Sequence, residues 1–244
     1  VTGTVRRFDC IQHLDCTYVQ FDAYNGDPEN ILHGYDVVIN CIGLIKPHLT
    51  DTLTAVQVNT LFPLKTSTLC KKYGSKFIHI TSDCVFSGET GNYSEDDEHD
   101  MIDLYGRTKS LGEPVDCMVL RTSIIGPELH SYVSLLDWVR TSSDTILSGY
   151  VNHIWNGITT KQYAKIISQI IDENLYEEGT FHVHSPYPVS KYDLVSMIIQ
   201  SLSLNKTVRP YNTDISIDRT LSTVKELNSK LNVPLLEQQV EELN

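Results

Sequence analysis

Short runs of hydrophobic residues alternate along the chain with longer segments in which apolar residues recur at helical spacing. Five runs are rich in β-branched and apolar residues and read as strands. They lie at residues 1–7, 17–22, 36–43, 76–82 and 117–123. Residues 52–73 read as a helix that Pro63 kinks, and a second helix is expected to begin near Asp103 and to stop before Pro114. This alternation predicts an α/β fold with a Rossmann-like, doubly wound parallel sheet.

The pattern changes after Pro127. The elements expected there are a helix at 134–140, a strand at 145–150, a loop around Trp155, and helices at 163–171 and 190–202. We therefore expect residues 1–127 to form the main domain. Residues 128–244 should form mainly a small C-terminal lobe, with some segments returning to the main domain.

The net charge of the chain limits the kinds of molecule that it is expected to bind. The formal net charge is −12, whereas nucleic acids and anionic membrane surfaces are bound by clustered Lys and Arg. No apolar run approaches the ~20 residues of a membrane span, and the chain opens without a signal peptide. We expect a soluble, cytoplasmic protein that binds neither nucleic acid nor membrane.

Cysteine and histidine give no sign of a metal site. The six cysteines form no CxxC pair, and Cys41 and Cys117 fall in strand-like runs, so reduced core thiols are expected. His182 and His184 alternate along a strand without ligand partners nearby, so no metal is expected there. The acidic residues 94–100 read as a solvated loop.

Tyr105 and Lys109 are the first chemical signal. Their spacing of four places both side chains on one helix face. A free tyrosine titrates near ~10, and a neighbouring ammonium stabilises its phenolate. A YxxxK pair alone is a weak signal, because exposed pairs of this kind are common. Its context strengthens it: Ser82 ends an apolar strand, and open α/β sheets bind ligands beyond the carboxyl ends of their strands.

Four consecutive segments resemble one family. They are HITSDCVFSG, GNYSEDD, DLYGRTKSLGE and VLRTSIIGPE, and the run VVINCIG with the later Asn59 matches as well. They resemble the extended short-chain dehydrogenase/reductases that include dTDP-4-dehydrorhamnose reductase, in order, over about residues 1–225. The resemblance implies NADPH-dependent reduction of the 4-keto group of a nucleotide-activated deoxysugar for polysaccharide synthesis. NADP(H) would be the cofactor, with NAD(H) as the alternative, and a homodimer is possible.

The resemblance also assigns roles to residues. Tyr105 would protonate the carbonyl oxygen, Ser82 would hold that oxygen, and Lys109 would bind the nicotinamide ribose and lower the pKa of Tyr105. The positions that would line the cofactor are Arg6, Arg7, Asp22, Cys41, Ile42, Gly43 and Asn59, with Tyr105 and Lys109. Those that would contact the substrate are Asp83, Cys84, Val85 and Trp155.

Position 84 separates related activities. The related dehydratases have Asp-Glu after the catalytic hydroxyl residue, because elimination of water needs an acid and a base. This chain has Asp83-Cys84, which disfavours dehydration. The reductases usually have Tyr at this position, so the chain departs from them too.

The beginning of the chain leaves alternatives open. A complete family member starts with a strand, a GxxGxxG turn and a helix, and this glycine motif is not found here. Residues 1–7 read either as the first strand or, as we favour, as the second, with about 20–30 residues preceding it in complete members. Arg6 and Arg7 would then lie where a 2′-phosphate binds, unless they are simply a solvated pair. Three functions are therefore compatible: a reductase, a non-catalytic binding or regulatory protein on the same fold, and a sugar-nucleotide epimerase, which the VFSG segment disfavours.

Overall fold

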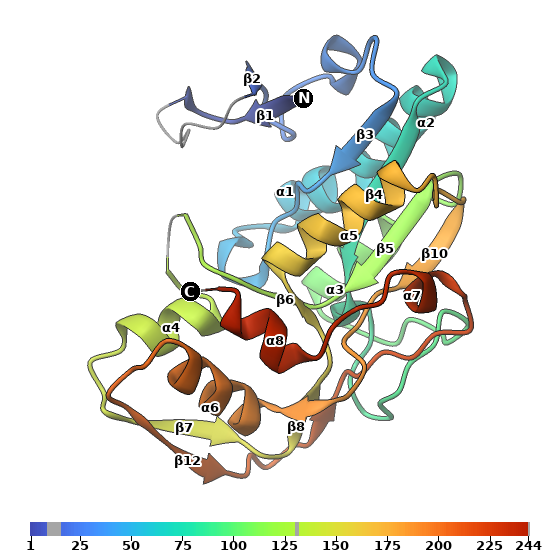
Figure 1. Cartoon of the computed structure of the whole chain (residues 1–244). Helices are drawn as coiled ribbons and strands as arrows, with labels where there is room; N and C mark the ends of the chain where they lie inside the picture. Colours follow the sequence, from blue (N-terminus) through green and yellow to red (C-terminus); the bar gives the residue numbers. More distant parts are fainter. Residues whose placement is uncertain (9–15, 130–131, 244) are drawn as a thin grey trace.

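Four parallel strands form the main sheet of the computed structural model, which describes residues 1–8, 16–129 and 132–243 (Figure 1). In spatial order they are β10 (Gly179–His182), β5 (Met118–Thr122), β4 (Lys76–Ser82) and β3 (Val37–Asn40). Ser82 pairs with Thr122 in register, so the carboxyl ends of β4 and β5 lie at the same edge. The predicted parallel α/β sheet is confirmed.

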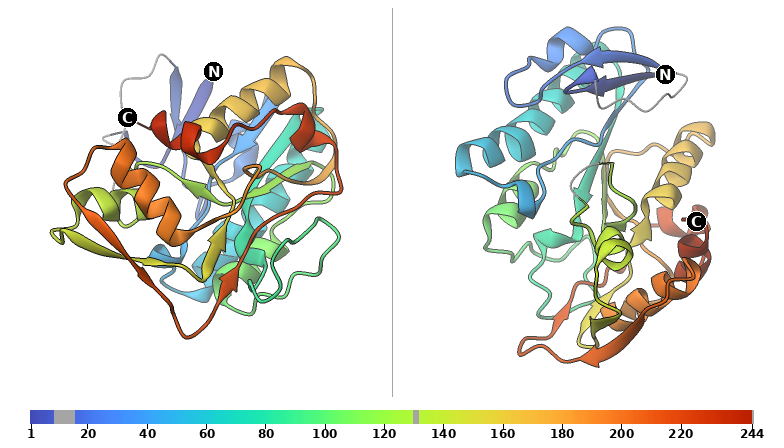
Figure 2. Two further views of the ribbon diagram at one scale, coloured as in Figure 1. Left: turned by 60° about the horizontal axis from the view of Figure 1, so that its bottom comes forward. Right: turned by 90° about the vertical axis from the view of Figure 1, so that its left-hand side faces the viewer.

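Helices cover both faces of this sheet (Figure 2). One face carries α1 (Thr52–Val56), a π-helical turn (Gln57–Leu61), α2 (Phe62–Tyr73) and α3 (Leu104–Leu111), and the other carries α5 (Thr160–Asp172). The side chains of β5 alternate accordingly. Val119 packs in the core beside α2, whereas Met118 and Leu120 pack in the core beside α5. The arrangement is doubly wound.

The kink expected at Pro63 is a π-helical turn. Pro63 has no N–H to donate to the carbonyl of Asn59, so the helix leaves its regular hydrogen-bond pattern just before it. The end of α3 comes close to that carbonyl: a Cβ on Gly112 would lie 1.9 Å from Asn59 O. Glycine at position 112 therefore allows α3 to pack against the π-helical turn.

Segments after residue 127 contribute to two cores. The C-terminal lobe contains α4 (Leu135–Thr141), β7 (Ile146–Tyr150), α6 (Lys191–Ser201), β12 (Thr207–Tyr211) and α8 (Leu236–Glu241) (Figure 1). Its core is formed by apolar side chains such as Leu136, Leu147 and Ile198. In contrast, α5, β10 and α7 (Leu227–Lys230) pack with the main sheet.

Two smaller sheets connect the lobe to the main sheet. One has the order β11 (Val189–Ser190), β8 (His153–Trp155) and β13 (Ile217–Asp218), and the other pairs β6 (Ile124–Ile125) with β9 (Ile158–Thr159). The first of these sheets determines the position of several side chains described below.

The strands β1 (Thr2–Val5) and β2 (Thr17–Gln20) form a parallel sheet of their own, which is not hydrogen-bonded to β3 (Figure 1). As a result β3 is an edge strand, and Ile39 is 39% exposed. The expectation that Cys41 is a core thiol is wrong, because it follows this edge strand and is exposed. Cys117, which directly precedes the central strand β5, is buried as expected. Cys10 lies outside the described residues.

The acidic stretch is not simply solvated. The Glu95 carboxylate accepts hydrogen bonds from the backbone N–H groups of His182 and Val224 and from the hydroxyl of Thr223. It thus fixes this loop to β10 and to the segment before α7. His182 itself is a satisfied core residue: Nε2 lies 2.7 Å from Arg121 Nη1, and Nδ1 lies 2.8 Å from Ser222 O.

The described ranges contain no helix that is long and apolar enough to cross a membrane. Within the same ranges, no three His, Cys, Asp or Glu side chains are grouped so that they could hold a metal ion.

Candidate active site

Three side chains meet where β4 ends and α3 begins. Ser82 is the last residue of β4, and Tyr105 and Lys109 lie on α3. The start of α3 is fixed by Asp103, whose carboxylate accepts a hydrogen bond from Gly106 N. The hydroxyl of Ser82 lies close enough to the Tyr105 phenol to oppose the rise of its pKa. The structure therefore places the expected catalytic hydroxyl beside the expected acid.

Burial has the largest effect on the pKa of the Tyr105 phenol. It raises the pKa of Tyr105 well above its ordinary value, and the neighbouring Cys84 and Asp83 act in the same direction, while Ser82 opposes them. The lowering of this pKa by Lys109 stays a prediction, since Lys109 is not among the main influences on the Tyr105 phenol. The Lys109 ammonium instead donates to the backbone carbonyl of Ile80, at 3.3 Å. Tyr105 is thus a protonated phenol throughout the physiological pH range.

Lys109 and Asn59 lie beside the position that a side chain at residue 43 would occupy. The Lys109 side chain is buried, and burial lowers its pKa to about 8. A Cβ at Gly43 would lie 3.5 Å from Lys109 Nζ and 3.6 Å from Asn59 Oδ1. Because position 43 is glycine, the space beside the ammonium and the amide is not filled by a side chain. This space beside Gly43, called the Gly43 recess below, is bordered by groups that can bond to hydroxyl groups such as those of a ribose.

The loop after β3 is held to α3 by Asn59. Its Oδ1 accepts from Leu44 N at 2.8 Å, and its Nδ2 donates to Leu44 O at 3.1 Å and to the hydroxyl of Thr108. Cys41, Ile42 and Gly43 belong to this same loop. The structure therefore brings the predicted cofactor positions Gly43 and Asn59 next to Lys109, and Cys41 and Ile42 directly precede Gly43 in the loop.

The remaining predicted cofactor residues lie around the β1–β2 sheet. Asp22 follows β2, and its Oδ1 accepts from Tyr24 N at 2.9 Å. Its neighbour Phe21 packs in one core with Ile42, so this turn lies on the same side as the 41–43 loop. Arg6 and Arg7 follow β1, and both residues are exposed.

The turn after Ser82 carries three predicted substrate contacts. The Ser82 hydroxyl bonds to the Asp83 carboxylate at 3.1 Å and accepts from Cys84 N at 3.1 Å. Asp83 is buried and Cys84 is half-buried. Val85 is wrong as a side-chain contact to substrate, because it is fully enclosed in an apolar cluster with Phe86, Tyr93 and Leu221. It supports the turn instead.

Trp155 lies on β8 and is only 3% exposed. Most of the indole packs in the lobe core, and a lysine that the sequence did not single out lies over it: Lys191 Nζ is 4.4 Å from the ring centroid. A second lysine was also missed, Lys46, whose Nζ is 5.8 Å from the centre of the Tyr105 ring. The sequence contains no periodic or motif signal for either contact, because both join segments that are far apart in the chain.

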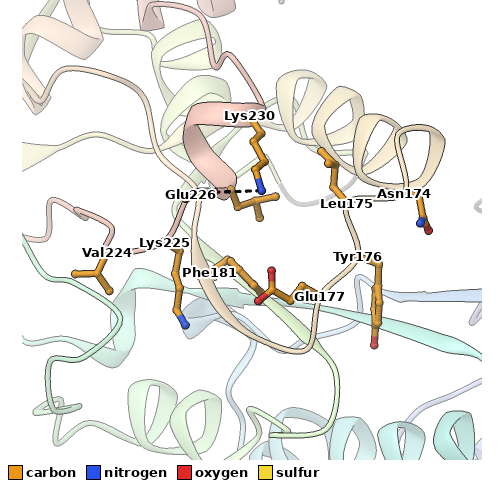
Figure 3. A pocket seen from close by; sticks show the side chains of 10 residues that line it. Asn174, Leu175, Tyr176, Glu177, Phe181, Val224, Lys225, Glu226 and Lys230 are labelled. Carbon is orange, nitrogen blue, oxygen red and sulfur yellow. Dashed lines mark ion pairs between the residues drawn. The ribbon is translucent and has the colours of Figure 1, made fainter.

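A separate cavity of about 470 Å³ lies beside the edge strand β10 (Figure 3). It is lined by Phe181, the segment between α5 and β10, the residues just before α7 and α7 itself, including the Glu226–Lys230 ion pair. None of the predicted site residues lines it.

Solved structures share this fold. A dTDP-4-dehydrorhamnose reductase from Clostridium acetobutylicum superposes with a TM-score of 0.76 at 20% identity, covering 94% of this chain and 90% of that one. The Bacillus anthracis dTDP-4-dehydrorhamnose reductase, solved in complex with NADP, gives 0.71 at 19% identity and covers 85% and 79%.

Curated relatives are similar in sequence. A probable low-salt glycan biosynthesis reductase of Haloferax volcanii is 27% identical over 84% of this chain and 74% of its own length. Methionine adenosyltransferase 2 subunit beta of Danio rerio is 24% identical over 78% of this chain, which spans only 62% of that protein. Residues 34–239 match the family described as the RmlD substrate binding domain. This range includes the Ser82, Tyr105 and Lys109 site, and the chain belongs to that family.

Proposed function

We propose that this protein reduces the 4-keto group of a nucleotide-activated deoxysugar with NADPH, in the synthesis of polysaccharide precursors. The observation that carries the proposal is the meeting of a protonated phenol, a hydroxyl and a buried ammonium at the carboxyl end of β4. Ketone reduction needs a proton donor and a hydrogen bond at one oxygen, and Tyr105 and Ser82 supply both.

The residues divide the reaction between them. Bound NADPH would supply a hydride to the carbonyl carbon. Tyr105 donates its proton to the carbonyl oxygen, which becomes the hydroxyl of the product, and Ser82 holds that oxygen during the transfer. A phenol is already protonated at neutral pH, and because burial raises the pKa of Tyr105 further, its proton leaves only as negative charge develops on the oxygen.

The recess at Gly43 supports a nicotinamide nucleotide. Lys109 Nζ and the Asn59 amide border it, and both can bond to ribose hydroxyls. The NADP complex of the Bacillus anthracis reductase supports this choice of cofactor. Arg6 and Arg7 favour NADPH over NADH, because two guanidinium groups pair well with a 2′-phosphate.

The proposal is tested by mixing this chain with NADPH and a dTDP- or UDP-linked 4-keto-6-deoxysugar and following NADPH oxidation and the sugar product. Oxidation of one NADPH for each 4-hydroxy sugar formed is expected. NADPH binding without oxidation in the presence of every such sugar would contradict the proposal.

A second candidate is a non-catalytic subunit of another enzyme. It is favoured by the similarity to methionine adenosyltransferase 2 subunit beta, together with the Cys84 departure from the usual reductase pattern. In that case NADPH would bind at the Gly43 recess without turnover, and the Tyr105→Phe substitution would have no functional effect.

A further inference from the structure

Two hydrogen-bond donors beside the catalytic turn have no acceptor. The buried indole Nε1 of Trp155 has no hydrogen-bond partner among the residues that the structure describes. Lys191, whose ammonium lies over the same indole, makes no hydrogen bond or ion pair within that part of the chain either. Buried or half-buried donors of this kind normally have a partner, so their combination points to an acceptor that belongs to a ligand.

The small sheet of the lobe fixes this pair in place. Val189 of β11 pairs with Trp155 of β8, and Ser190 pairs with Ile154. Lys191 follows directly as the first residue of α6. A capping box between Ser190 and Asp193 fixes where α6 begins, and therefore where Lys191 points. The position of Lys191 over Trp155 thus follows from strand pairing rather than from a flexible surface chain.

The surrounding charges are unbalanced. Lys191 and Arg219 both act on the buried carboxylate of Asp83, the residue after the catalytic Ser82. Arg219 follows β13, on the other side of β8, and its Nε donates to Phe86 O at 3.0 Å. Asp83 is therefore shared by two cations, and because Arg219 also acts on Asp103, Lys191 is left without a carboxylate of its own. Burial lowers the pKa of Lys191 to about 8, so its ammonium lacks full solvation and would be stabilised by an anion.

We infer that Lys191, with the indole N–H of Trp155, forms an anion subsite that binds phosphate or carboxylate oxygens of the nucleotide sugar. The inference rests on the proposed function and assigns Lys191 to it as a substrate-binding residue. The subsite adjoins Asp83, so the bound anion is either the diphosphate of the substrate or a carboxylate on its sugar ring.

Binding titrations of the whole chain test this subsite. The probes are UDP-glucose, whose anionic groups are the two phosphates, and UDP-glucuronic acid, which adds a sugar carboxylate; dTDP-glucose covers the other nucleotide. A Trp138→Phe background leaves Trp155 as the single tryptophan, since the chain has two, so its fluorescence reports binding beside Lys191. Calorimetry gives the affinities independently.

Lys191→Met removes the charge at similar length and should weaken binding at least roughly tenfold, because a charge-assisted bond is lost. Lys191→Arg retains the charge and should restore most of the affinity. Lys225→Met is the matched control: Lys225 also lies over an aromatic ring, 5.9 Å from the centre of Phe181, but in the cavity beside β10. It should leave binding unchanged.

The pattern of losses identifies the anion. Equal losses for UDP-glucose and UDP-glucuronic acid show that Lys191 binds the diphosphate, and a loss confined to UDP-glucuronic acid shows that it binds the carboxylate. Unchanged affinity of Lys191→Met for every probe overturns the subsite while leaving the proposed function intact. If the unaltered chain binds no nucleotide sugar, the proposed function fails and the subsite with it.

Discussion

Burial shifts the pKa values of Tyr105 and Lys109 in opposite directions for one reason. A low-dielectric environment disfavours the charged form of each group, which is the phenolate for tyrosine and the ammonium for lysine. Tyr105 therefore keeps its proton, whereas the pKa of Lys109 falls to about 8. The YxxxK spacing predicts the shared helix face but not these shifts, because spacing carries no information on burial.

The lowered pKa of Lys109 predicts a pH limit on cofactor use. Below about pH 8 the free enzyme carries the ammonium, and above it the neutral amine, which binds ribose hydroxyls less well. The kcat/KM for NADPH should therefore fall as pH rises through about 8, approaching a tenfold loss for each further pH unit. Steady-state kinetics between pH 6 and about 10 measure this.

The pKa of Lys191 is also lowered to about 8, so a control must show which of the two lysines causes the pH dependence. The fall in kcat/KM for NADPH should persist in Lys191→Met. In Lys109→Met the kcat/KM should be low at every pH in this range and should no longer depend on pH. A profile of the unaltered enzyme that stays flat past pH 9 would show that Lys109 does not need its charge.

Strand β5 depends on a buried ion pair. Arg121 donates to the Glu113 carboxylate through Nε at 3.2 Å and Nη2 at 2.6 Å, and both side chains are more than 90% buried. The imidazole Nε2 atoms of His99 and His182 each lie 2.7 Å from a nitrogen of the same guanidinium. This cluster connects the end of α3 to β5 and β10.

Breaking this pair should destabilise the fold. Arg121→Met leaves the Glu113 carboxylate buried without its partner and should lower the free energy of unfolding by about 3–5 kcal/mol. Urea unfolding measures it. Lys71→Met, which breaks the exposed Lys71–Asp116 pair, should cost less than about 1 kcal/mol. Equal small losses would show that the Arg121 cluster is better solvated than its burial indicates.

The local elements could be predicted from the sequence, and the contacts between them could not. The apolar run 76–82 became β4, and Asp103 and Ser190 begin helices as helix-capping residues do. Each of these signals is local, because the residues that produce it lie within a few positions of one another in the chain. The link from Glu95 to β10, the Lys191–Trp155 contact and the exposure of Cys41 depend on which segments the fold brings together.

At the scale of the molecule, the β1–β2 sheet is separate from the main sheet but carries the residues expected to choose the cofactor (Figure 1). Arg6 and Arg7 are exposed at the end of β1. Replacing both by Ala should weaken NADPH binding roughly tenfold more than NADH binding, because only NADPH has a 2′-phosphate to pair with. Fluorescence titrations with both cofactors measure this. Equal losses would mean that these arginines do not contact the phosphate.

In the proposed reaction Tyr105 alone donates the proton, so the rate of ketone reduction by Tyr105→Phe decides whether this site works as proposed. The substitution removes the hydroxyl and keeps the ring, and Tyr187→Phe, at an exposed position, is the control. With NADPH and a nucleotide 4-keto-sugar, Tyr105→Phe should lose on the order of 10²–10⁴-fold in kcat while its NADPH affinity stays nearly unchanged, because the phenol acts only as charge develops on the oxygen. A Tyr105→Phe enzyme that reduces the sugar at close to the normal rate would contradict the assignment of Tyr105 as the acid.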